Sequence, residues 1–253
     1  MRAMARIFFS EQRTARSEDQ FNGKERVMDI AGLQKLSLLD YPGKICCIVF
    51  TAGCNFRCPF CHNAAVVNNT LPQIPESEVL TFLEKRKNLL EGVCVSGGEP
   101  LLQSGLEQFL AKIKALGYAV KLDTNGSFPD RFADLINANL IDYVAMDIKN
   151  TPQKYALTVG CGVDYSLIEQ SAKIIMSSGI NYELRTTLVK QIHTPADIEQ
   201  IGQAFKGAKR FYLQNFAASN DLLGNIPLTP LTDGEMKAAL EIIKRHIPNA
   251  EIR

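Results

Sequence analysis

Three cysteines lie close together in residues 51–63 of the chain. Cys54, Cys58 and Cys61 have the spacing C-x3-C-x2-C. Thiolates are soft ligands that bind zinc and iron–sulfur clusters. Cysteines with this spacing on one short loop can bind three irons of a cubane, which leaves the fourth iron without a protein thiolate. An iron with an open position can bind a substrate, so the spacing predicts a catalytic iron–sulfur site.

A structural zinc site is the main alternative, with His62 as the fourth ligand. Zinc sites with three cysteines and one histidine usually draw their ligands from two separated pairs. Here all four ligands crowd into one short loop and two are adjacent, which would strain a tetrahedron, so we favour the cluster. The remaining cysteines, Cys46, Cys47, Cys94 and Cys161, form no second close set. We therefore expect no auxiliary cluster, and we expect Cys161 to be either inert or a reactive loop thiol.

Glycines and charged residues follow or end several apolar runs. Gly97 and Gly98 let the backbone approach a ligand closely, and Glu99 beside them can accept hydrogen bonds from an ammonium group. The other candidates are Asp123, Asp147, Lys149 and Arg185. These residues also have ordinary explanations. The glycines and Asp123 can belong to plain turns, Lys149 can be solvated, and Arg185 can form a structural ion pair.

The elements that must position these residues alternate along the chain. Apolar runs predict strands at 45–51, 93–96, 118–124, 143–148, 182–189, 210–216 and 250–252. Helical periodicity predicts helices at 75–90, 106–113, 131–138, 167–178, 195–205 and 233–246. Alternating strands and helices indicate an α/β fold with a parallel sheet. About six units are fewer than the eight of a closed barrel, so we expect a partial, open (β/α)6 barrel with its reactive groups at the carboxyl ends of the strands.

Composition excludes several classes of protein. The chain has 253 residues, 28 Lys plus Arg and 27 Asp plus Glu, which gives no electrostatic footprint for nucleic acid or an anionic membrane. We find no apolar run near the ~20 residues of a membrane span and no signal-peptide core, so we expect a cytoplasmic protein. Residues 1–27 are rich in charge and poor in apolar residues after Phe9. We expect a flexible extension at 1–27 and one domain at 28–253.

The cysteine loop and the glycine turn together resemble the radical S-adenosylmethionine (SAM) superfamily. The pattern is Cys54-x3-Cys58-x-Phe60-Cys61 followed by Gly97-Gly98-Glu99-Pro100. The resemblance implies that the cysteines hold a [4Fe–4S] cluster and that SAM chelates the fourth iron through its amino and carboxylate groups. One electron passed to the sulfonium then breaks the S–C5′ bond, and the resulting 5′-deoxyadenosyl radical abstracts a hydrogen atom.

Further segments of residues 28–253 resemble the subgroup that activates glycyl radical enzymes, especially the activating proteins of anaerobic ribonucleoside-triphosphate reductase. They are 36–43, 61–63, 123–126, 146–149 and 212–220. This resemblance implies that reductase as the partner and a flavodoxin or ferredoxin as the electron donor. We keep three alternatives: an activator of another glycyl radical enzyme such as pyruvate formate-lyase, a radical SAM enzyme acting on a small molecule, and a zinc-stabilised binding module.

The resemblance also implies roles for individual residues toward SAM. Phe60, Cys61 and His62 would line its nucleoside side, and Gly98 would meet its amino group. Asp123 and Asp147 would flank the ribose, because carboxylates accept hydrogen bonds from hydroxyls. Lys149 would pair with charge on SAM, and Arg185 is a further candidate for that role. Pyruvate formate-lyase activators carry a histidine near the end of the last barrel strand, whereas residues 214–217 contain none, which argues against that partner.

Asp40 is the candidate for contact with the partner enzyme. Pro42 fixes its own φ and Gly43 allows a tight turn, so we expect Asp40 to be held at the edge of the barrel mouth. There the resemblance implies a contact with the backbone of the incoming glycyl loop. The alternative is that Asp40 only caps its own turn.

Overall fold

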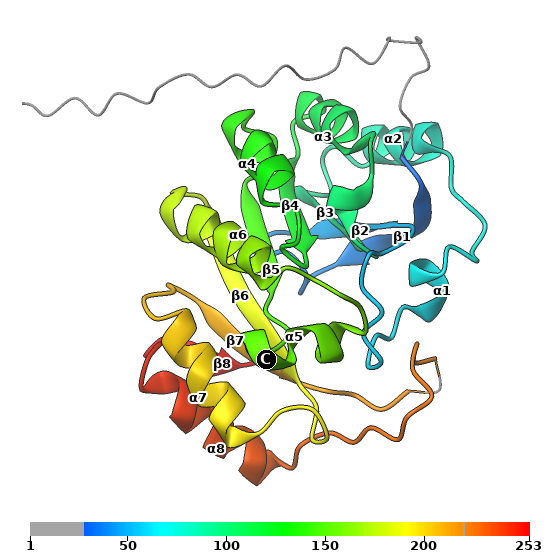
Figure 1. Ribbon diagram of the computed structural model, residues 1–253. Coiled ribbons are helices and arrows are strands. Elements are labelled where there is room, and N and C mark those ends of the chain that lie inside the picture. Colours follow the sequence, from blue (N-terminus) through cyan, green and yellow to red (C-terminus); the bar gives the residue numbers. More distant parts are fainter. Residues whose placement is uncertain (1–27, 220) are drawn as a thin grey trace, which may run out of the picture.

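The computed structural model describes residues 28–219 and 221–253, and the predicted extension at 1–27 lies outside this range (Figure 1). The described chain forms one eight-stranded sheet in the order β1 to β8. The strands are β1 (Ile30–Ser37), β2 (Cys46–Thr51), β3 (Gly92–Gly97), β4 (Ala119–Thr124), β5 (Tyr143–Asp147), β6 (Asn181–Leu188), β7 (Phe211–Asn215) and β8 (Ala250–Ile252). Strands β2 to β8 run parallel, whereas β1 pairs antiparallel with β2.

The predicted strands are confirmed to within one residue at each end, because their sequences are nearly continuous apolar runs. In β2, for example, Cys46 to Val49 are all buried, as expected for a strand covered on both faces. The strand β1 was not predicted. Its sequence, IAGLQKLS, includes an internal glycine and its later residues are exposed, so it carries little strand signal.

Helices connect the parallel strands. They are α1 (Ala64–Val67), α2 (Glu76–Lys85), the short 3-10 helix η1 (Pro100–Leu102), α3 (Leu106–Ala115), α4 (Pro129–Asn137), α5 (Pro152–Val159), α6 (Tyr165–Ser177), α7 (Pro195–Ala204) and α8 (Asp233–Lys244). Thr194 and Thr232 form capping boxes at the starts of α7 and α8, which is why these two helices begin where the sequence predicts. The helix predicted at 75–90 ends earlier, at Lys85, because Arg86 leaves the helical conformation.

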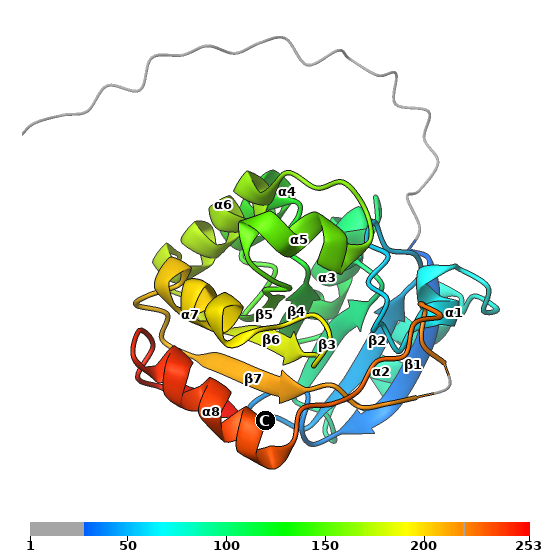
Figure 2. The same cartoon turned by 60° about the horizontal axis from the view of Figure 1, so that its bottom comes forward.

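The sheet curves with helices on its outer side, and the main apolar core lies between these two layers (Figure 2). A small second cluster lies apart from it and consists of Tyr41, Cys46, Ile48, Cys94 and Tyr143. Within the described residues, β1 and β8 are the two edges of the sheet and do not pair with each other. The expected open partial barrel with six strand–helix units is therefore confirmed. Across residues 28–219 and 221–253, no helix has the length and apolar character needed to span a bilayer.

Candidate active site

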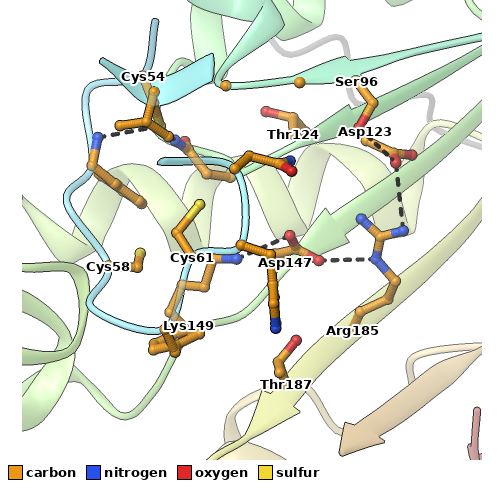
Figure 3. A pocket seen from close by; sticks show the side chains of 18 residues that line it. Cys54, Cys58, Cys61, Ser96, Asp123, Thr124, Asp147, Lys149, Arg185 and Thr187 are labelled. Carbon is orange, nitrogen blue, oxygen red and sulfur yellow. Dashed lines mark hydrogen bonds and ion pairs between the residues drawn. The ribbon is translucent and has the colours of Figure 1, made fainter. Parts of the chain in front are cut away.

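A pocket of about 240 Å³ lies at the carboxyl ends of the strands. Its walls come from the loop after β2, here called the cysteine loop (residues 52–63), and from the ends of β3 to β6 (Figure 3). Nearly all the predicted site residues line it: Cys54, Cys58, Phe60, Cys61, His62, Gly97, Gly98, Asp123, Asp147, Lys149 and Arg185. The sheet thus brings together residues far apart in sequence, as expected for a parallel α/β fold.

The cysteine loop is held from behind by the end of α5. The Arg57 N–H donates to the carbonyl of Val159 at 2.7 Å. Gly160 next to it has φ +69°, and a Cβ there would lie 2.4 Å from the Arg57 carbonyl oxygen, so only glycine fits. The Arg57 guanidinium also donates to carbonyl groups within its own loop. These contacts fix the loop backbone that carries the three thiols.

The thiols of Cys54, Cys58 and Cys61 share one wall of the pocket (Figure 3). Burial raises the pKa of Cys54 to about 11 and that of Cys58 to about 12. Both thiols are therefore protonated at neutral pH in the metal-free chain. Since thiolates are the ligands of iron and zinc, metal binding must release these protons, and loading will be favoured by higher pH.

The glycine turn after β3 packs against the cysteine loop. Gly97 has φ +118°, and a Cβ on Gly98 would lie 1.7 Å from the Gly53 carbonyl oxygen. Two hydrogen bonds hold the turn and the loop together at this distance. The Gly98 N–H donates to the Thr51 carbonyl and the Glu99 N–H to the Gly53 carbonyl, both at 2.9 Å. The turn therefore fixes the start of the cysteine loop while exposing its own backbone to the pocket.

The prediction that the Glu99 side chain faces an ammonium group is wrong. Glu99 is fully buried behind the pocket, where its carboxylate accepts hydrogen bonds from Leu101 N–H, Thr124 Oγ1 and Asn125 N–H at 2.7–3.0 Å. Glu99 consequently ties the β3 turn to the β4 turn.

The opposite wall is a network of charges. Asp147 accepts hydrogen bonds from Lys149 Nζ at 3.0 Å and from Arg185 Nε at 2.9 Å. Burial would raise the pKa of Asp147, but the two cations outweigh it and hold the pKa well below its usual range. Lys149 lies 6.0 Å from the centre of the Phe60 ring. Cations with fixed positions next to open space can bind a carboxylate.

Asp123 carries two partners that sequence reasoning missed. Ser96 Oγ donates to it at 3.1 Å, and Lys121 forms an ion pair with it. The Lys121 side chain is only 2% exposed, which is rare for lysine and requires such a partner. Burial would raise the pKa of Asp123, but Lys121 and Arg185 lower it. Lys121 precedes Asp123 by two residues on one face of a strand, and that spacing was a signal available in the sequence.

His62 is turned toward the loop after β7. Its Nε2 lies 2.5 Å from the Ala217 carbonyl oxygen, and its ring stacks on Phe216 with centroids 5.5 Å apart. The zinc alternative needs a His62 nitrogen beside the three sulfurs, so this geometry weakens it. Phe216 and Ala217 lie in the stretch where the resemblance showed no histidine, and they contact His62 instead.

Asp40 does not lie at the pocket. Because β1 and β2 are antiparallel, the turn that holds Asp40 is at the amino-terminal end of β2, whereas the cysteine loop leaves the carboxyl end. A six-residue strand separates the two by about 20 Å. The Asp40 carboxylate accepts one hydrogen bond from Ser37 Oγ within its own turn, and the Asp40 N–H donates to the same oxygen. The predicted position at the barrel mouth is therefore wrong, and the capping role is the one observed.

Comparison with known proteins assigns the chain to a family. Residues 48–205 match the family described as the radical SAM superfamily. The chain belongs to this superfamily. It is thus a radical SAM enzyme, whose cofactors are SAM and a [4Fe–4S] cluster.

Two relatives show how far the similarity extends. A protein of Methanocaldococcus jannaschii, named as a candidate glycyl-radical enzyme activating enzyme, is 32% identical over 230 residues, covering 88% of this chain and 95% of that protein. The GTP 3′,8-cyclase of Helicobacter pylori is 32% identical over 165 residues, covering 61% of this chain. That match spans 50% of the cyclase, so this chain corresponds to about half of its length.

A solved structure supports the fold. SuiB of Streptococcus suis, bound to its precursor peptide SuiA, superposes with a TM-score of 0.63 at 15% identity, over 81% of this chain and 48% of SuiB. At this identity the similarity concerns the fold alone. It supports the α/β arrangement of strands and helices described above.

The residues of the pocket fit the two cofactors. Three soft thiols on one loop suit a cluster with one iron left open. Across the pocket, Lys149 and Arg185 suit the carboxylate of SAM, and Asp123 and Asp147 suit its ribose hydroxyls. The exposed backbone of Gly97 and Gly98 lies between these two walls, where it can meet the methionyl amino group.

Proposed function

We propose that this radical SAM enzyme activates a glycyl radical enzyme by removing a hydrogen atom from a glycine Cα of that partner. The observation that carries the proposal is the extent of the match with the M. jannaschii protein, which covers 95% of that protein. The cyclase named for a nucleotide substrate is matched over only half of its length. The chain therefore resembles an activating enzyme as a whole and the cyclase only in part.

In this proposal the side chains of the pocket bind and orient SAM. Lys149 and Arg185 neutralise its carboxylate, while Asp123 and Asp147, kept ionised by neighbouring cations, accept hydrogen bonds from the ribose. Cys54, Cys58 and Cys61 would hold the [4Fe–4S] cluster, which when bound would supply the electron for reductive cleavage of SAM. Fixed cations and carboxylates at both ends of SAM would hold its reactive carbon in one orientation.

We further propose anaerobic ribonucleoside-triphosphate reductase as the partner and a flavodoxin or ferredoxin as the electron donor. The resemblance of segments 36–43 and 212–220 supports this choice, and so does the absence of histidine at 214–217. The unpaired edges β1 and β8 leave one side of the sheet open, and a loop of another protein needs such access.

The test is a reconstitution with purified proteins under anaerobic conditions. The four-iron form is mixed with SAM, a reductant and the reductase, and electron paramagnetic resonance is expected to show the doublet of a glycyl radical. The reductase with its radical glycine replaced by alanine is the control and should give no doublet. A radical on pyruvate formate-lyase but not on the reductase would refute the reductase as the partner, while the activating function would still stand.

The second candidate is a radical SAM reaction on a small molecule, which the cyclase match favours. It predicts SAM cleavage that is stimulated by a nucleotide and no radical on either protein partner. Chromatography of a reaction with GTP would show a new nucleotide product. That result would overturn the activating function while leaving the radical SAM assignment intact.

A further inference from the structure

The side-chain amide of Asn125 lies behind one of the three cluster cysteines. Its Nδ2 is 3.9 Å from Cys54 Sγ and 2.9 Å from Asn55 Oδ1. Asn125 follows β4 and is only 6% exposed, so water cannot replace these contacts.

The direction of the amide is determined by its neighbours. Asn125 Oδ1 accepts the Ser127 backbone N–H at 3.0 Å, and a backbone N–H can only donate. The oxygen must therefore face Ser127, which turns the NH2 group toward Cys54 and Asn55. Glu99 fixes the backbone of the same residue by accepting its N–H at 2.7 Å.

The surroundings of the three sulfurs are unequal. The sulfur of Cys54 meets two N–H groups, that of Phe56 at 3.4 Å and the amide of Asn125. In residues 28–219 and 221–253, no hydrogen bond reaches the sulfur of Cys58 or Cys61. An N–H aimed at a cluster sulfur stabilises the extra negative charge of the reduced cluster, and such bonds are one of the factors that set cluster potentials.

We propose that Asn125 is a positioning residue that raises the reduction potential of the cluster through its hydrogen bond to Cys54. The amide makes the cluster easier to reduce. The same NH2 group also donates to Asn55 Oδ1 at 2.9 Å, a contact that does not involve the sulfur.

The test measures the potential of the reconstituted enzyme by a redox titration followed with electron paramagnetic resonance, without SAM. Asn125→Leu keeps the branched shape and removes the N–H. At the wild-type midpoint, its ratio of reduced to oxidised cluster is expected to fall about tenfold, the effect of one lost hydrogen bond. For a one-electron couple a tenfold change is about 59 mV.

Asn55→Leu is the matched control. It removes the contact between the two asparagines and leaves the N–H directed at Cys54, so its potential should stay at the wild-type value. An unchanged potential in Asn125→Leu, or an equal shift in both variants, would overturn the proposal. If Asn125→Leu binds less than four irons, Asn125→Ala is titrated instead, and a loading defect in that variant too would show a purely structural role.

Discussion

At the residue scale, the pocket depends on buried charged side chains that ion pairs hold in fixed positions. Asp147 lies between Lys149 and Arg185, and Asp123 between Lys121 and Arg185. Each carboxylate is held ionised because its two neighbouring cations lower its pKa by more than burial raises it. The network therefore stays rigid before SAM binds, and its cations need little rearrangement to accept a carboxylate.

Replacing any one of Cys54, Cys58 and Cys61 by alanine is expected to abolish cluster binding and SAM cleavage. The fold should remain, because the main core lies between sheet and helices. Iron analysis, visible absorption and circular dichroism check this. Cys161→Ala is the matched control, since Cys161 touches the cysteine loop but does not line the pocket. Four irons in any of the three variants would refute the ligand assignment.

Lys149→Ala is expected to weaken SAM binding and leave the cluster intact. A charge-assisted hydrogen bond contributes about 1.5–3 kcal/mol, so the dissociation constant should rise roughly tenfold to a hundredfold. Equilibrium binding to the reconstituted protein measures it. Lys154→Ala, which breaks an ion pair with Asp197 on α7, should bind SAM normally. Equal affinities of wild type and Lys149→Ala would mean that this lysine serves Asp147 alone.

Predicted and observed roles agree best for side chains that have one main chemical role, such as thiols. The thiols were predicted from their spacing, and the cations of the pocket from the family resemblance that this spacing carries. Glu99 was assigned the wrong direction, since nothing in the sequence tells that its carboxylate accepts the N–H groups of Leu101 and Asn125. The amide of Asn125 was not singled out in the sequence, because its contact with Cys54 joins residues distant in sequence.

At the scale of elements, the parallel strands were predictable from the sequence, whereas the antiparallel edge strand β1 was not. Central strands need apolar residues on both faces, which marks them clearly. Strand β1 pairs on one side only and is exposed over part of its length, so tertiary pairing, not propensity, makes it a strand. That omission produced the error for Asp40, because the direction of β1 decides at which end of the sheet its turn lies.

Glu99, which ties the β3 turn to the β4 turn, predicts a pH dependence of stability. Burial raises its pKa to about 7, from 4.5 in an exposed glutamate. Between these values the unfolded chain loses the proton and the folded chain keeps it. Rising pH therefore lowers the free energy of unfolding across this window, by on the order of 3 kcal/mol.

Urea titrations of the metal-free protein at several pH values between 4.5 and 8 measure this effect. The control is Glu99→Gln. Whatever its absolute stability, its free energy of unfolding should not show this decrease with rising pH. Parallel pH profiles for the two proteins would show that Glu99 does not titrate in this range.

At the scale of the whole molecule, the described domain begins at a buried residue. Met28 is almost fully covered, and its N–H donates to Glu76 on α2. Residues 1–27 carry little apolar sequence and no cofactor motif. Removing them and keeping Met28 is therefore expected to leave the melting temperature and the rate of SAM cleavage unchanged. A lower melting temperature on truncation would show that the segment contributes to the domain.

The strand order repeats the order of the chain, and this has a consequence for synthesis on the ribosome. Each strand that emerges can add to an edge that already exists, so no strand waits for a distant partner. The metal-binding thiols leave the ribosome long before Arg185 and Thr187 complete the pocket. During that interval the nascent thiols lack their opposite wall. Iron delivery is thus best timed after β6 has emerged, when the completed wall can protect the cluster from oxidants.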